Sequence, residues 1–251
     1  MTMAICYLFA QNYKTPKRDE RMWPNTPPAA ATVMALIGIN LGIFLLWKFP
    51  PAWRTLNRYF IVTSLYPYGA SIIGSAFSHQ KTVHALVNMA ALWLMGTKGS
   101  AGDTDLPAQV HDDIGRGNFL AIYMASGVLS SFTSLAAHVL AGNLRYTSLG
   151  ASGAVCGLVA TWLMVRSNDV FTFYFLPREL DEIVKARGST ILAAVVGFEI
   201  ISILSPWKFT RLDNWGHLGG YIAGAASGYA LKARMEKDRR KKRSWWGNLT
   251  E

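Results

Sequence analysis

The chain has 251 residues, of which 51% are hydrophobic and only 16% are charged, and its formal net charge at pH 7 is +10. A soluble domain usually carries about a quarter charged residues, so the composition argues against a soluble enzyme and favours a membrane protein. The positive charge does not indicate a nucleic-acid-binding protein, because eight of the 25 Lys and Arg residues lie in the C-terminal segment from Lys232 onward. Such a segment is typical of a basic tail beside a membrane.

Six apolar segments follow one another along the chain, and several approach the ~20 residues that a helix needs to cross a bilayer. A polar N-terminal tail over residues 1–28 precedes them, and a basic tail over 233–251 follows. We therefore predict an all-α, polytopic membrane bundle of six transmembrane helices over residues 29–232. The predicted spans are 29–47, 82–97, 118–141, 148–166, 190–204 and 215–232.

The first connection, residues 48–83, is long and rich in aromatic and basic side chains. Its apolar stretch 69–77 is too short to span, so we expect this connection to lie in the membrane interface. Lys and Arg number eighteen in the two tails and the second and fourth connections, against seven in the other three. The positive-inside rule then predicts both termini on the cytoplasmic side, or its organellar equivalent.

With this topology the second, fourth and sixth spans start from the same face, and each has polar residues near its start. These residues are His84 and Asn88, then Ser152, then His217. A Ser hydroxyl becomes a nucleophile when a neighbouring base takes its proton, and His217 is the candidate base. Asn88, His84 on the same helical face and the backbone N–H groups near Ser152 are candidate donors to an oxyanion. Each of these residues, taken alone, could also have a purely structural role, such as a hydrogen bond within or between helices.

Small residues recur every four positions on the fourth and sixth spans. Gly153 and Gly157 lie on the fourth, and Gly216, Gly220, Gly224 and Gly228 lie on the sixth. This spacing lets two membrane helices approach closely, which would bring Ser152 and His217 within hydrogen-bond reach. Taken alone, the spacing favours ordinary glycine-mediated packing over a catalytic interface.

Three further side chains have open interpretations. Glu199 is the only acidic residue deep in a span, and it could be a structural hydrogen-bond partner, a proton relay or part of a transport path. Asp213 could complete a triad with His217, although solvation in a short exposed link is the simpler reading. His79 could brace the loop. The two cysteines show no metal-ligand spacing, so we predict no metal and no disulfide.

In combination these residues resemble the rhomboid intramembrane serine proteases, over roughly residues 54 to 230. The resemblance rests on three sequence motifs, which are Ser78-His79-x4-His84-x3-Asn88, Gly150-Ala151-Ser152-Gly153 and His217-x2-Gly220-x3-Gly224-x3-Gly228. The resemblance implies a Ser152–His217 dyad, and an oxyanion hole made by His84, Asn88 and the Ser152 N–H. It also implies that the fifth connection, about Ser205 to Asn214, caps the site. Many bacterial members have a Tyr where this chain has Cys156, so stacking of that ring on the catalytic His is not expected here.

The chain is most similar to the mitochondrial, presenilin-associated rhomboid-like branch. This finer resemblance rests on Phe175-Leu176-Pro177, Trp207-Lys208-Phe209 and Gly150-Ala151-Ser152. It implies a multi-pass protein of the mitochondrial inner membrane. Members usually carry an extra N-terminal span and a presequence, and the first eleven residues make a poor transit or signal peptide. We therefore expect that the N-terminus is incomplete.

The expected function is an intramembrane serine endopeptidase that cleaves transmembrane substrates in the lipid bilayer, without cofactor, metal or nucleic acid. One alternative is a catalytically inactive rhomboid-like protein that binds or escorts membrane clients, although such relatives typically lack the Ser or the His. A second alternative is a small transporter with Glu199 in its path, although no inverted repeat supports it. Substrate identity and oligomeric state do not follow from the sequence.

Overall fold

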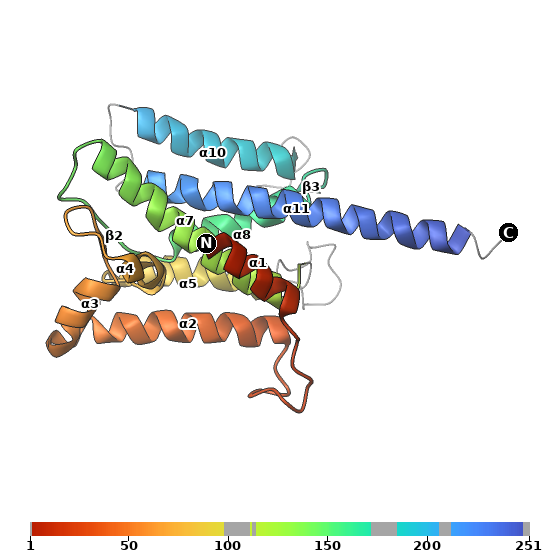
Figure 1. Ribbon diagram of the computed structural model, residues 1–251, viewed down its shortest axis with the longest axis horizontal. Helices are drawn as coiled ribbons and strands as arrows, with labels where there is room; N and C mark the ends of the chain where they lie inside the picture. Colours follow the sequence, from red (N-terminus) through yellow and green to blue (C-terminus); the bar gives the residue numbers. More distant parts are fainter. Residues whose placement is uncertain (1, 98–110, 112–113, 172–184, 206–211, 248–251) are drawn as a thin grey trace.

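The computed structural model describes residues 2–97, 111, 114–171, 185–205 and 212–247, and over these the chain is a helical bundle with two short sheets (Figure 1). Each segment predicted as a span contains a helix. The six helices are α2 (Pro28–Leu46), α5 (Thr82–Thr97), α7 (Arg116–Leu140), α8 (Ser152–Val165), α10 (Gly188–Leu204) and α11 (Asn214–Gly247).

The helices differ in how well they meet the requirements for crossing a membrane. Among the described residues, α2 and α7 are long and apolar enough, and α5, α8 and α10 are shorter apolar helices. Large apolar side chains point outward from the bundle, for example Ile39 and Val87, whereas Asn40 and Thr161 are buried inside it. Continuous apolar surface of this kind suits a lipid environment.

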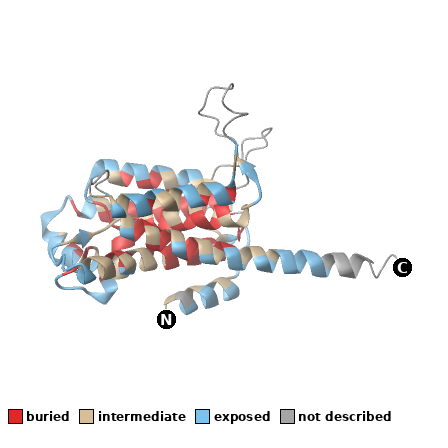
Figure 2. Cartoon of the chain, turned by 90° about the horizontal axis from the view of Figure 1, so that it is seen from above, coloured by how far each residue is buried: buried red, intermediate tan, exposed pale blue. Residues whose placement is uncertain are grey.

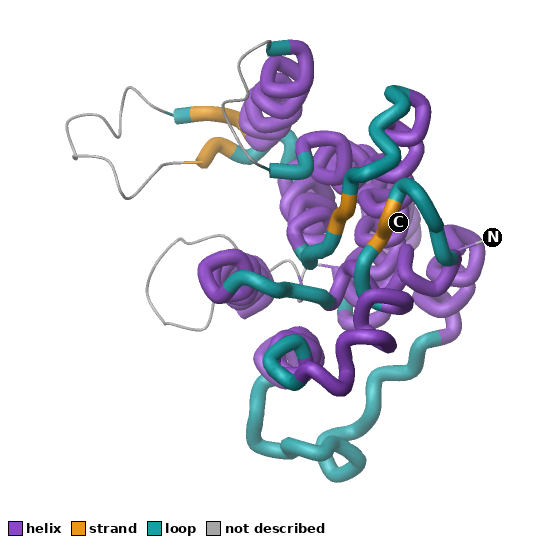
Figure 3. Tube along the Cα trace, turned by 90° about the vertical axis from the view of Figure 1, so that its left-hand side faces the viewer, coloured by secondary structure: helices purple, strands orange, loops and turns teal. Residues whose placement is uncertain are grey.

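The first connection contains only short elements. They are η1 (Pro50–Ala52), α3 (Trp53–Tyr59), β1 (Val62–Thr63), α4 (Gly69–Gly74) and η2 (Ser75–Phe77). Helix α2 ends before Pro50 and Pro51, where a continuing helix would lose backbone hydrogen bonds. Strand β1 pairs antiparallel with β2 (Thr147–Ser148), with Val62 opposite Ser148, at the end of the bundle seen in Figure 3.

Both terminal segments differ from the tails expected from the sequence. Residues 2–12 form helix α1 (Thr2–Asn12), which packs along α7. Helix α11 does not end near Lys232 but continues to Gly247 and projects beyond the bundle, and most of its residues from 233 to 241 are exposed (Figure 2). The side chain of Arg234 on this extension donates to the Gln11 amide oxygen at 3.1 Å. The terminal segments therefore contact each other and the bundle.

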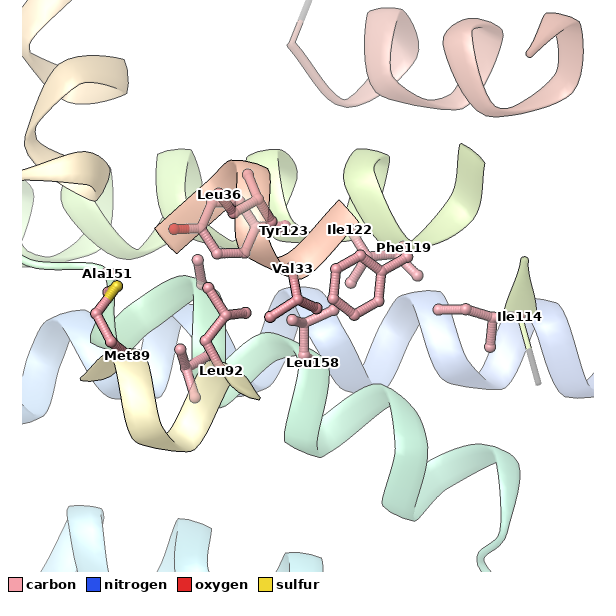
Figure 4. Packing of buried hydrophobic residues seen from close by; sticks show 12 residues of the cluster. Val33, Leu36, Met89, Leu92, Ile114, Phe119, Ile122, Tyr123, Ala151 and Leu158 are labelled. Atoms are coloured by element: carbon pink, nitrogen blue, oxygen red, sulfur yellow. The ribbon is translucent and has the colours of Figure 1, made fainter. Parts of the chain in front are cut away.

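The largest buried apolar cluster joins α2, α5, α7 and the start of α8 (Figure 4). Val33, Leu92, Phe119 and Leu158 at its centre are fully buried. Ala151 and Val155 of this cluster flank Ser152 along the chain, so packing of the core also fixes the start of α8. A second short sheet, β3 (Val170–Phe171) with β4 (Ala186–Arg187), lies at the other end of α8.

Helices α5, α8 and α11 all start at the end of the bundle where α3, α4 and β2 lie (Figure 1). The polar residues near the three helix starts are thereby brought to one level. Helix α11 makes its most extensive contacts with α8 and then with α7.

Candidate active site

The hydroxyl of Ser152 and the imidazole of His217 meet at this end of the bundle. Ser152 is the first residue of α8, and His217 lies in the first turn of α11. The Ser152 Oγ lies 3.1 Å from the His217 Nε2, a hydrogen-bonding distance across 65 residues of sequence. A base at this distance can take the serine proton, and this is the geometry that nucleophilic catalysis by serine requires.

Glycines between α8 and α11 allow this approach. A Cβ added at Gly220 would collide with the carbonyl oxygen of Gly153, and one added at Gly224 would collide with the carbonyl oxygen of Gly157. The Thr161 hydroxyl donates across the same interface to the Gly224 carbonyl at 3.0 Å. The two backbones are therefore in direct contact, which is close enough for the side chains at the helix starts to touch.

The loop before Ser152 is held by the first connection. The Gly150 N–H donates to the Ser75 carbonyl at 2.9 Å, and the Ala151 N–H donates to the His79 Nε2 at 3.3 Å. Gly150 has a φ of +138°, and a Cβ there would lie 2.7 Å from the Cε1 of His84. A side chain at Gly150 would therefore strain the backbone and displace His84.

His79 and His84 both lie beside this loop and have different surroundings. His79 is fully buried, and its ring meets the His84 ring edge-on, with 5.0 Å between centroids. Burial, reinforced by His84, lowers the pKa of His79 to about 4. The ring therefore stays neutral at physiological pH, and its Nε2 can accept the Ala151 N–H. Sequence reasoning suggested that His79 braces the loop, and the hydrogen bond shows how.

The two expected side-chain oxyanion donors are placed differently. His84 lines the cavity beside Ser152. Asn88, one turn further along α5, is buried, does not line that cavity, and uses its Nδ2 to donate to the His84 carbonyl at 2.9 Å. One amide hydrogen is thus engaged by its own helix. The first N–H groups of α8, which starts at Ser152, have no acceptor within the helix.

A cavity of about 430 Å³ opens over Ser152 and His217. Its wall is formed by the start of α5, the middle of α7, the loop that precedes Ser152 and the start of α11. Polar side chains that line it include Ser130, Tyr146 and Lys81. Burial and the adjacent Asp213 raise the pKa of the Tyr146 phenol, so this group is a hydrogen-bond donor at neutral pH.

Glu199 is the site residue whose position sequence reasoning did not foresee. Its Oε1 lies 2.9 Å from the His217 Nδ1, on the opposite side of the ring from Ser152, and the residue is buried. The only sequence signal was an acidic residue deep in an apolar span. Periodicity carries no information about this contact, because Glu199 and His217 lie on different helices.

Asp213 does not approach the imidazole as a third member would. Its carboxylate accepts the Ser148 hydroxyl at 2.6 Å and the Gly216 N–H at 2.9 Å. Asp213 therefore caps the start of α11 and ties it to β2. Asp213 is therefore neither simply solvated nor the third member of a triad with His217.

Cys156 lies one turn after Ser152 on α8, and it is a free cysteine. Within the described ranges no group of three His, Cys, Asp or Glu side chains is placed to hold a metal ion. Three expected features fall wholly or mainly outside the described residues. They are the capping loop of the fifth connection and the motifs Phe175-Leu176-Pro177 and Trp207-Lys208-Phe209.

Comparison with known proteins identifies a Rhomboid domain over residues 68–234, close to the expected range of 54–230. Rhomboid protein 1, mitochondrial, of Saccharomyces cerevisiae is 32% identical over 212 residues, covering 84% of this chain and 56% of that protein. Presenilin-associated rhomboid-like protein, mitochondrial, of Homo sapiens is 29% identical over 210 residues, covering 83% and 50%.

A bacterial relative, rhomboid protease GluP of Bacillus subtilis, is 29% identical over 153 residues, covering 61% of this chain and 24% of that protein. The chain thus spans about half the length of the mitochondrial relatives that it matches. The resemblance deduced from the sequence motifs, including that to the mitochondrial branch, is confirmed by these matches.

Proposed function

The chain belongs to the rhomboid family, and from that premise we propose that it is an intramembrane serine endopeptidase that cleaves transmembrane segments of membrane proteins. The observation that carries the proposal is the 3.1 Å contact between Ser152 Oγ and His217 Nε2 beneath a polar cavity. A relative named as a rhomboid protease supports the same activity.

In the proposed reaction the Ser152 oxygen attacks the carbonyl carbon of the scissile bond while His217 Nε2 takes the hydroxyl proton. The tetrahedral intermediate collapses, the C–N bond breaks, and His217 returns the proton to the leaving amine. The acyl group remains on Ser152. Water then attacks the ester with His217 again acting as the base, which releases the carboxylic acid and regenerates the serine.

The negative oxygen of the tetrahedral intermediate needs hydrogen-bond donors already in place. We propose the Ser152 N–H, His84 and the remaining amide hydrogen of Asn88 for this role. His84 is the best placed side chain, since it lines the cavity and its ring occupies the space that a Cβ at Gly150 would need. Gly150, Gly153, Gly220 and Gly224 support the site through the close approaches described above.

The chain is an integral mitochondrial membrane protein, as its rhomboid domain and mitochondrial relatives indicate. We propose that it lies in the inner membrane, with six spans formed by α2, α5, α7, α8, α10 and the first half of α11. In this arrangement residues 29–232 form the membrane domain between the N-terminal segment 1–28 and the basic segment 233–251. Transmembrane proteins would be its substrates.

Replacement of the proposed nucleophile tests the activity directly. For Ser152→Ala we expect loss of cleavage of a single-span rhomboid substrate in proteoliposomes, because the variant lacks the hydroxyl that lies 3.1 Å from His217 Nε2. A fluorophosphonate probe should label the wild type and fail to label this variant. Cleavage is measured by gel, and labelling by fluorescence of the full chain.

Ser227→Ala is the matched control, because the Ser227 hydroxyl donates to the Ala223 carbonyl of its own helix and lies away from the cavity. This variant should keep both cleavage and labelling. Undiminished cleavage by purified Ser152→Ala would refute the proposal. A wild type that binds membrane proteins but is neither labelled nor active would indicate the escort function instead.

A further inference from the structure

Glu199 is an unusual residue in its helix. Helix α10 lies along one side of the bundle, and its buried residues are Gly188, Leu192 and Glu199 (Figure 1). The neighbouring Phe198 and Ile200 are exposed. The single acidic side chain of α10 is therefore among the few that the helix directs into the protein.

Burying a carboxylate costs free energy, so its presence here calls for a specific role. A carboxylate within the membrane loses strong hydration, and one hydrogen bond replaces only part of it. The Glu199 Oε2 has no hydrogen-bond partner among the described residues, so the compensation is incomplete. A neutral amide or hydroxyl could join α10 to α11 at a smaller cost. Packing of α10 against α11 therefore does not explain why this residue is an acid.

The contacts of the His217 imidazole explain the acid, because both ring nitrogens lie within hydrogen-bond distance of a partner. Its Nδ1 lies 2.9 Å from Glu199 Oε1 and its Nε2 lies 3.1 Å from Ser152 Oγ. A carboxylate accepts hydrogen bonds and cannot donate them, so the Nδ1 must carry a proton. In the neutral ring the Nε2 is then the bare nitrogen, which is the form that a general base facing Ser152 needs.

We propose that Glu199 is a positioning residue that holds His217 in its Nδ1–H tautomer and stabilises the imidazolium formed when Ser152 attacks. The inference rests on the proposed protease function and adds a third member to the Ser152–His217 pair. Glu199 does not touch the substrate. The serine proton moves to Nε2 and then to the leaving amine.

Among the residues that the structure describes, no other acid takes this place. The carboxylate of Asp213, the nearest acidic residue in sequence, is held by the Ser148 hydroxyl and the Gly216 N–H. Glu199 is therefore the group that the tertiary structure presents to His217 Nδ1.

Kinetics separates positioning from simple packing. Glu199→Gln keeps the shape of the side chain, but its amide can donate to Nδ1 and so favour the wrong tautomer. We expect kcat to fall by roughly 10²- to 10⁴-fold, as in other serine enzymes that lose this acid, with KM changed by less than about threefold. Glu199→Asp keeps the carboxylate and should recover part of kcat. Phe198→Leu, on the exposed face of the same turn, should match the wild type.

Labelling by the fluorophosphonate probe should slow in parallel with kcat in Glu199→Gln. Thermal unfolding in detergent checks that each variant is folded. A kcat for Glu199→Gln within about threefold of the wild type, while Ser152→Ala is inactive, would overturn the role of Glu199 and leave the protease proposal intact. Failure of Glu199→Asp to exceed Glu199→Gln would count against the requirement for a carboxylate.

A second measurement does not depend on activity. The full chain has five histidines, so ¹⁵N-histidine spectra in lipid nanodiscs can be assigned with His217→Gln as reference. We expect a protonated Nδ1 and a bare Nε2 for His217, and loss of this Nδ1–H signal in Glu199→Gln. A wild-type ring protonated at Nε2 alone would overturn the inference. An unlabelled, inactive wild type would contradict the protease function, and the tautomer would then decide the role of Glu199.

Discussion

His79 illustrates how one buried side chain can control a site that it does not touch. Its neutral Nε2 accepts the N–H of Ala151, the residue directly before the proposed nucleophile. Protonation would replace this acceptor with a donor and would also charge a fully buried ring beside His84. The position of Ser152 thus depends on the protonation state of a residue 73 positions earlier.

This arrangement predicts a pH-dependent stability. The pKa of His79 is lowered from 6.5 to about 4, so the unfolded chain takes up the proton first as pH falls. The contribution of His79 is complete above pH 6.5 and is lost between pH 6.5 and about 4, by up to about 3 kcal/mol. Thermal unfolding of the wild type in detergent over this range should show the decline.

His79→Gln is the matching variant, because its amide oxygen can accept the Ala151 N–H and does not titrate. We expect a shallower decline in its melting temperature over the same pH range. Equal slopes for the two proteins would assign the pH dependence to another group, of which His84 is the neighbouring candidate.

At the scale of elements, the contact between α8 and α11 determines whether the two proposed catalytic side chains meet. The helices touch through backbone at Gly153, Gly157, Gly220 and Gly224. Interiors are close-packed, so a single added methyl group must push the helices apart or distort them. The Ser152–His217 distance, set at the ends of these helices, would lengthen with any separation.

We therefore expect Gly220→Ala to lower stability by about 1–3 kcal/mol and to reduce cleavage together with probe labelling. Gly42→Ala is the control, because an added Cβ on this exposed part of α2 meets nothing within 4 Å. It should leave activity unchanged. Stability is measured by unfolding in detergent. Normal probe labelling of Gly220→Ala would show that the glycine contacts between α8 and α11 do not set the geometry of the site.

The whole molecule places the cavity and the basic segment at different ends of the bundle. The first connection and the starts of α5, α8 and α11 lie at one end, and the extension of α11 projects from the other (Figure 1). The end with the cavity receives the connections that are poor in Lys and Arg. By the positive-inside rule the cavity should open towards the intermembrane space and the C-terminal extension towards the matrix.

Single cysteines in a Cys6→Ser, Cys156→Ser background test this orientation. Tyr66→Cys, in the exposed part of the first connection, should react with a membrane-impermeant maleimide added outside mitoplasts. Lys237→Cys on the exposed extension of α11 should react only after the membrane is permeabilised. Reaction of both from the same side would contradict the orientation.

The sequence by itself determined the helical segments and the family. Runs of apolar residues and their breaks at Pro and charge depend on local physics, so the positions of all six helices followed from them. The common level of His84, Ser152 and His217 followed from alternating chain direction. The four-residue glycine spacing indicated where two helices could touch. The helix over residues 2–12 and the continuation of α11 to Gly247 were not predicted. The first is apolar but too short to span a membrane, and the polar composition of the second does not by itself stop a helix.

Only the tertiary structure decided what surrounds the Ser152–His217 pair. The contact of Glu199 with His217, the bracing of Ala151 by His79 and the capping role of Asp213 join segments on different elements. Sequence periodicity describes one face of one helix, whereas these contacts depend on the rotation and offset of neighbouring helices. That rotation and offset are set by packing, and packing is known only when the whole bundle is assembled.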